Sequence, residues 1–214
     1  MTKLKELTFR NFYKKLLFIE DTNNLNVLNK GYGIEIDGDE NGLLVYGYVD
    51  QDQGICFNVF SIVKEEDGEI VKYNDKPVEE KINHRIRLSD VQDLRGYEVE
   101  LDPDILERYV ARAMELNEKF FESESKDALR YNMQIDQYRH LIFPDDLECY
   151  IYNKEENKLE GFWMRSKSLA PDGIIGEIIT PLSRLFGYGI GDEIKVNLYS
   201  VNDYIRLMHV VESK

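Results

Sequence analysis

The chain of 214 residues is poor in the residue types that build reactive centres, with 2 cysteines, 3 histidines and 1 tryptophan. Cys56 and Cys149 lie far apart and outside any C-x-x-C or zinc-type spacing. Both fall in apolar runs, where a thiol behaves as a small buried hydrophobe. We therefore expect two reduced core cysteines. A disulfide between them would require the fold to bring them together.

Catalytic signatures are equally scarce. His84, His140 and His209 form neither H-x-x-x-H nor H-E-x-x-H, so a zinc hydrolase loses its main signal. No serine lies in a G-x-S-x-G elbow. A nucleophilic pair of Cys149 with His140 or His209 stays open, because such partners meet in space and not in sequence. We expect no catalytic residues, no metal and no cofactor, and the balance favours a protein that is not an enzyme.

Long apolar runs are absent. No stretch approaches the length of a membrane span, and Leu16–Ile19 is too short for the core of a signal peptide. We therefore expect a cytoplasmic protein.

Positive charge is in deficit, since 27 Lys and Arg oppose 41 Asp and Glu for a net charge of -14. Such a field repels nucleic acid and anionic lipid, so we expect neither as a direct partner. Solubility explains the acidity most simply. A sharper alternative is an acidic decoy that occupies the basic groove of a nucleic-acid-binding protein. The locally basic residues 1–20 pair with the acidic body, or form a mobile arm that meets a partner.

The first half of the chain has the pattern of a β-meander or small barrel. Four runs rich in β-branched and aromatic residues alternate with turn clusters, namely 31–37, 42–50, 54–64 and 69–75. Gly47 inside one run predicts a bulge or a close backbone approach. Alternation at residues 7–13 suggests a further strand, and residues 77–100 suggest a short helix, stopped at Gly96, and a strand.

The middle of the chain predicts helix. Asp102 suits an N-cap and Pro103 the first helical position. Apolar residues then recur at helical spacing and predict one buried face, made of Leu106, Tyr109, Val110, Ala113, Leu116 and Phe120. The polar run 122–127 should end this helix, and a second one is expected over 128–141.

Two loops invite a ligand interpretation. Asp37, Asp39, Asn41 and Gly42 match the first half of a calcium loop, but its twelfth position is Tyr48 where a Glu belongs. A polar hairpin loop is the simpler interpretation. The glycines near Tyr32 and in 187–191 lack phosphate-loop spacing, which predicts turns.

From 147 to 211, short apolar runs alternate with turn clusters, which predicts an antiparallel meander. Within one run, Phe162 and Met164 face one side of the strand, and Trp163 and Arg165 the other. If the Trp163 side is open, the pair is a candidate partner-binding anchor, since Trp and Arg are enriched at hot spots. The alternative places Trp163 in the core.

This region resembles the YegJ-like small β-domain family of unknown function. The resemblance covers about a third of the chain, roughly 147–211. It is carried by the run 161–165, the turn 171–173 and the strand 174–180, then by the Gly-Asp turn at 191 and by Asn202-Asp203-Tyr204. Tyr204 stands where the family has a later Trp. The resemblance implies a compact, mostly antiparallel β fold that follows a helix, and it brings no activity.

Together these patterns predict an α+β protein with a β-rich part (1–100), a helical segment (101–143) and a small β-domain (144–214). The expected function is a cytoplasmic bacterial interaction or adaptor module, with an immunity, anti-defence or regulatory role, that binds another, possibly basic, protein. The alternative is an enzyme or small-ligand binder with a cleft between the two β-rich parts.

Overall fold

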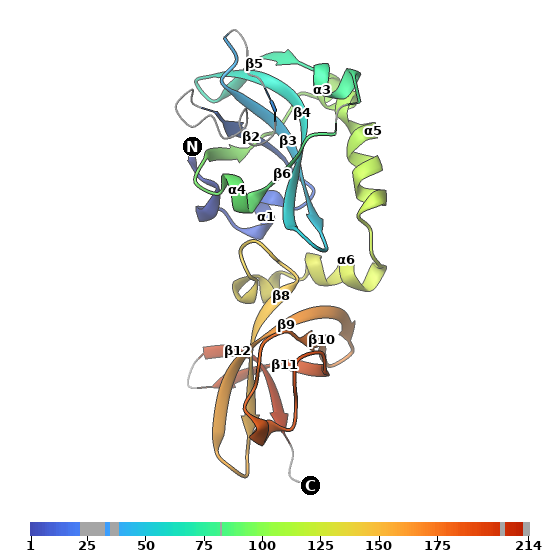
Figure 1. Cartoon of the computed structure of the whole chain (residues 1–214). Helices are drawn as coiled ribbons and strands as arrows, with labels where there is room; N and C mark the ends of the chain where they lie inside the picture. The colour runs from blue at the N-terminus through green and yellow to red at the C-terminus, as the bar shows by residue number, and fades with distance from the viewer. Residues whose placement is uncertain (22–32, 35–38, 82, 202–203, 212–214) are drawn as a thin grey trace. The chain divides into compact units, whose positions relative to one another are not determined.

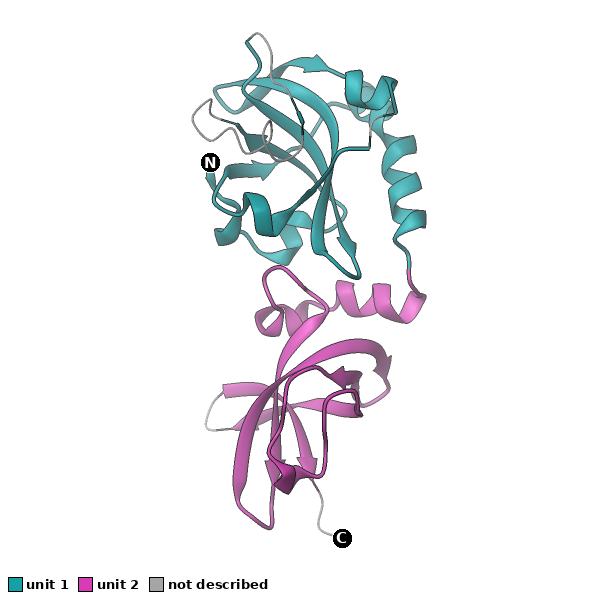
Figure 2. Cartoon of the chain, viewed as in Figure 1, with its two compact units in different colours: residues 1–121 teal, residues 122–214 magenta. Residues whose placement is uncertain are grey.

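The computed structural model describes residues 1–21, 33–34, 39–81, 83–201 and 204–211. The chain divides into two compact units, Met1–Phe121 and Glu122–Lys214, each of which is described by itself (Figure 2). The expected α+β class is confirmed, since both units are rich in strands and the middle of the chain is helical. The helical segment 101–143 is shared, because α5 belongs to unit 1 and α6 to unit 2.

Unit 1 is built on one antiparallel sheet with the strand order β1-β7-β2-β3-β4-β5, and β6 pairs with β4 (Figure 1). Its elements are β1 (Thr2–Lys3), η1 (Leu4–Glu6), α1 (Phe9–Phe12), β2 (Leu16–Glu20), β3 (Gly42–Asp50), β4 (Gly54–Glu66), β5 (Glu69–Asn74), α3 (Lys76–Glu79), β6 (Arg85–Arg87), α4 (Leu88–Val91), β7 (Arg95–Glu98) and α5 (Pro103–Lys119).

Both faces of this sheet are covered, which is why every residue of β3 is buried. Side chains alternate along the strand, so Leu43 and Val45 enter one apolar layer while Leu44 and Tyr46 enter the other. Residues of α1 and α4 contribute to the first layer. Helix α5 runs beside the sheet (Figure 1). Its residues Tyr109 and Leu116 close the second layer.

Gly47 marks a close backbone approach, as its position inside a strand predicted. A Cβ built on Gly47 would lie 2.1 Å from the carbonyl oxygen of Phe12. The amide of Lys14 donates to the Gly47 carbonyl at 2.9 Å, and the Gly47 amide donates to the Lys15 carbonyl at 2.9 Å. The chain between α1 and β2 is therefore laid directly against β3.

Two local predictions in unit 1 are wrong. Residues 7–13 contain the helix α1 (Phe9–Phe12) instead of a strand, because Phe9 and Phe12 bury their rings in the first apolar layer. Gly96 lies inside β7 and does not stop a helix. Of the two alternatives for the basic residues 1–20, the structure supports pairing with acidic residues of the same unit, since Lys5 binds Asp93 at 2.7 Å and Lys15 binds Glu98 at 2.5 Å.

Unit 2 is a closed five-stranded barrel with the order β10-β11-β12-β8-β9. Neighbouring strands are antiparallel except β12 and β8, which are parallel. Its elements are α6 (Glu124–Tyr131), η2 (Met133–Tyr138), β8 (Asp146–Asn153), β9 (Lys158–Ala170), β10 (Gly173–Ile178), η3 (Arg184–Phe186), β11 (Glu193–Val201) and β12 (Tyr204–Val211). The meander expected from 147 to 211 is confirmed.

Helix α6 begins earlier than the sequence suggested. The polar run 122–127 contains its first turn, because the Ser123 side chain caps the helix by accepting a hydrogen bond from the Lys126 amide at 3.1 Å. The helix expected over 128–141 is thus α6 followed by the separate 3-10 helix η2.

A buried ionic cluster fixes α6 to the barrel. Arg130 binds Asp145 through two hydrogen bonds of 2.7 and 3.2 Å and also binds Glu122. Lys126 lies 3.4 Å from Asp145 and donates to the Ser166 carbonyl in β9. Burial would raise the pKa of Asp145, but the hydrogen bond and charge of Arg130, with the charge of Lys126, hold it below its usual range.

Among the described residues, no helix is both long enough and apolar enough to span a membrane.

Candidate functional site

Helix α5 carries more apolar surface than the sheet of unit 1 covers. Tyr109 and Leu116 are buried as predicted. Leu106 and Val110, which the sequence also placed in the core, are 39% and 42% exposed, and Met114 is 57% exposed. These three residues follow one another at intervals of four, so they form a stripe along one side of the helix. The predicted buried face is therefore wrong for Leu106 and Val110.

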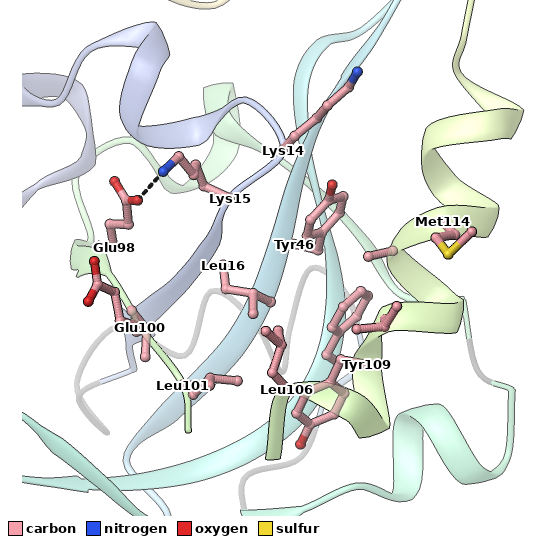
Figure 3. A pocket seen from close by; sticks show the side chains of 14 residues that line it. Lys14, Lys15, Leu16, Tyr46, Glu98, Glu100, Leu101, Leu106, Tyr109 and Met114 are labelled. Atoms are coloured by element: carbon pink, nitrogen blue, oxygen red, sulfur yellow. Dashed lines mark hydrogen bonds and ion pairs between the residues drawn. The ribbon is translucent and has the colours of Figure 1, made fainter. Parts of the chain in front are cut away.

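The stripe forms one wall of a groove of about 510 Å³, which we call the α5 groove (Figure 3). The opposite wall is formed by β2, β7 and the segments that flank these strands. It includes Leu16, Val99 and Leu101. This volume lies within the usual range for small-molecule and side-chain-binding sites. The whole lining comes from unit 1.

Aromatic rings form the floor of the α5 groove. Tyr46 of β3 stacks on Phe60 of β4 with centroids 5.6 Å apart, and Phe60 stacks on Tyr109 at 5.5 Å. Both tyrosines are held at their hydroxyls, since Tyr46 donates to Asn117 at 3.0 Å and Tyr109 donates to Asp75 at 2.5 Å. Burial, reinforced by the hydrogen bond to Asp75, raises the pKa of Tyr109. The floor is thus neutral and rigidly positioned.

Charged residues of both signs line the wall opposite α5. Lys15 and Glu98 form an ion pair of 2.5 Å (Figure 3). The Lys14 ammonium lies 5.0 Å from the ring centroid of Tyr13. Glu100 lines the groove and is exposed. The arrangement is an apolar trough with charges along one wall, which suits an amphipathic segment better than a fully apolar ligand.

Trp163 and Arg165 lie on the outer side of β9. Phe162 and Met164 fill the barrel core, which corrects the alternative that placed Trp163 inside. The Trp163 ring meets His140 edge-on at 5.4 Å. Arg165 is held by two hydrogen bonds to Asp146, of 2.8 and 3.1 Å. The pair is half-buried and already engaged within unit 2, and its partner-binding role stays a prediction.

The candidate nucleophile pairs lack the required arrangement. Cys149 is fully buried in the barrel core, where burial raises the pKa of its thiol and disfavours the thiolate. His140 accepts the amides of Ile142 and Phe143 at its Nδ1 atom. His209 contacts the Lys195 carbonyl at 2.8 Å and the Tyr188 hydroxyl at 3.2 Å. Both imidazoles therefore hold local structure.

The two cysteines are buried free thiols, as predicted, with Cys56 in the core of unit 1 and Cys149 in that of unit 2. Burial raises the pKa of Cys56 to about 12.

The candidate calcium loop is described only in part, because Asp37 lies outside the described residues. Asp39 binds Lys72 at 2.7 Å and Lys64 at 3.1 Å, and Asn41 holds the backbone of Glu65. Within the described ranges, no group of three or more His, Cys, Asp or Glu residues could hold a metal ion.

Two of the glycines that suggested a phosphate loop, Gly187 and Gly191, lie in a bend and a turn. Gly187 caps the 3-10 helix η3 with a φ of 76°, and Gly191 has a φ of 90° just before β11. Tyr32 lies outside the described residues.

No protein-family model, curated protein or solved structure matches the chain. The resemblance of residues 147–211 to the YegJ-like family therefore stays a prediction. Two of its residues, Asn202 and Asp203, lie outside the part of the chain that the structure describes.

Proposed function

We propose that the protein is a non-catalytic interaction module whose α5 groove receives an apolar segment of another protein. The observation that carries the proposal is the exposed stripe of Leu106, Val110 and Met114 over an aromatic floor. Exposed apolar residues gathered along a groove mark interaction sites, whereas scattered ones are ordinary.

The shape of the groove favours an amphipathic helix or extended peptide as the occupant. A partner side chain that enters it buries the Leu106–Met114 stripe and contacts the rings of Tyr46 and Tyr109. The net charge of -14 favours a partner with positive charge around its apolar anchors. A cytoplasmic adaptor with an immunity, anti-defence or regulatory role is the version that we propose first.

The second candidate is a small-ligand binder that uses the same α5 groove, because its volume of about 510 Å³ suits a drug-sized molecule. The predicted cleft between the two β-rich parts is a different site and stays a prediction. A small ligand binds tightly only where most of its surface is buried. The α5 groove encloses a ligand poorly, because the apolar side chains of its helical wall are exposed to solvent. The macromolecular partner is therefore the better supported of the two.

Affinity capture with matched variants tests the proposal. Val110→Glu places a charge in the groove, and Val71→Glu places the same charge at a site on β5 that is 53% exposed and outside the groove. We expect a captured partner to bind the wild type and Val71→Glu equally well. Its affinity for Val110→Glu should be at least about tenfold lower, because the burial of one apolar side chain is lost. Equal binding by all three proteins would refute the α5 groove as the site.

A further inference from the structure

The strands β11 and β12 extend beyond the barrel as a two-stranded ribbon (Figure 1). β11 pairs with β10 only through Glu193–Val196, while its pairing with β12 continues from Asn197 to Val201. In the described part of the chain, no strand pairs with the other side of 198–201. That side of β11 is therefore an open sheet edge, which we call the β11 edge.

The opposite side of the ribbon is less open. The Tyr138 hydroxyl donates a 2.5 Å hydrogen bond to the carbonyl of Ile205 in β12. Further along, β12 is covered by its parallel pairing with β8 from Met208 onward. The β11 edge is thus the more open side of the ribbon, where an added strand can pair.

The composition of the β11 edge suits self-association. Residues 197–201 read NLYSV and contain no charge and no proline, in a chain with 32% charged residues. Leu198 is 42% exposed and Tyr199 is 37% exposed. Edge strands that stay single usually carry a lysine, a proline or an inward charge, and residues 197–201 carry none of them.

Charge opposes a second copy of the chain least at this edge. Two molecules of net charge -14 repel each other, and the repulsion is smallest where the facing segments are neutral. An antiparallel edge is also self-complementary, because a twofold axis brings each strand to the same strand of its copy.

We infer that the β11 edge pairs with the β11 edge of a second copy, so that two ribbons form one continuous four-stranded sheet. The contact is short, so the dimer is reversible and depends on concentration. It involves unit 2 alone and is independent of the α5 groove in unit 1.

Sedimentation velocity over a range of concentrations tests the inference. We expect the wild type to pass from one chain mass to twice that mass as concentration rises. The double variant Leu198→Lys, Ser200→Lys should remain monomeric, since lysines of the two edges then face one another. This variant also lowers the net negative charge, so a lost dimer cannot come from greater overall repulsion.

Leu159→Lys is the matched control, because Leu159 is 50% exposed on β9 and lies away from this edge. It should dimerise as the wild type does, and fluorescence of Trp163 in each variant reports whether the barrel is folded. Hydrogen exchange provides the second readout, since the amides of 198–201 should gain protection with concentration. A wild type that is monomeric throughout, or a dimer that survives the double lysine variant, would overturn the inference.

Discussion

The two units solve the same problem in different ways, because each must cover the apolar faces of antiparallel strands. Unit 2 closes its strands into a barrel, and the inward side chains of Cys149, Phe162 and Met164 fill the interior. Unit 1 leaves its sheet open and covers one face with α5. The apolar residues of α5 extend further around the helix than the part that packs on the sheet. The difference indicates that closure buries the inward side chains of the barrel strands, whereas the helical cover of unit 1 leaves part of its own apolar side in an open groove.

The two units also differ in where they bury charge. Unit 2 holds Arg130 and Lys126 of α6, together with Asp145, almost fully buried where this helix meets the barrel. Helix α5 of unit 1 is instead held by aromatic stacking and by the tyrosine hydrogen bonds to Asp75 and Asn117. Stability of unit 2 should therefore depend on ion pairing and pH more strongly than stability of unit 1 does.

The largest expected effect comes from breaking the ionic cluster. Arg130→Ala leaves Asp145 buried without its main partner, which costs about 3–5 kcal/mol of folding free energy. Urea unfolding followed by Trp163 fluorescence reports on unit 2, since this is the only tryptophan of the chain. Lys195→Ala, which removes an exposed ion pair with Asp172, is the control and should leave the midpoint unchanged. Equal effects of the two substitutions would contradict the importance of the cluster.

The next effect concerns the close approach in unit 1. Gly47→Ala forces a methyl group against the Phe12 carbonyl and should destabilise unit 1 by about 1–3 kcal/mol. Circular dichroism should show an earlier transition, while the Trp163 transition stays in place. Gly161→Ala is the control, because its added Cβ has no neighbour closer than 3.6 Å. An unchanged Gly47→Ala protein would show that the backbone contact is loose.

Acidification should increase the difference in stability between the two units. The lowered pKa of Asp145 means that its contribution is complete above the unfolded value, about pH 4, and is lost as the pH falls through the folded value. We expect the stability of unit 2 to drop below about pH 4, with a smaller drop in Asp145→Asn. Trp163 fluorescence in urea at several pH values measures both slopes, and identical slopes would argue against this role of Asp145.

The smallest effect on stability is expected in the α5 groove. Val110→Glu and Met114→Glu change exposed side chains, so the free energy of unfolding should shift by no more than about 0.5 kcal/mol. Thermal unfolding checks this, with Leu116→Glu as the buried counterpart on the same helix. A large loss of stability in the two exposed variants would mean that the stripe serves folding and not binding.

Much of the fold could be predicted from local patterns. Turn clusters and alternation located β3, β4, β5 and the strands of the barrel, and Asp102-Pro103 located the start of α5. Helix α1 was missed because Phe9 and Phe12 follow tertiary packing, which overrides a short alternating pattern. Gly96 was misjudged because a glycine in a strand and a glycine after a helix look alike in sequence.

The candidate site was harder to predict. The six residues expected to form the buried face of α5 are correct as an apolar set, but their spread around the helix is wider than one stripe. Met114 lies four residues after Val110 and extends the same apolar stripe. This spacing could have indicated that one apolar side of α5 is not covered by the sheet. The floor could not have been predicted, because Tyr46, Phe60 and Tyr109 meet only once β3, β4 and α5 are assembled.

The most direct test of the account is site-specific photo-crosslinking in living cells, with benzoylphenylalanine placed at Met114 in the α5 groove or at Val71 outside it. Both positions are exposed, by 57% and 53%, so the probe itself is equally accessible. We predict a discrete cross-linked protein from position 114 that is absent from position 71 and disappears when Val110→Glu is added. No product from position 114, or the same products from both positions, would contradict the claim that another protein occupies this groove.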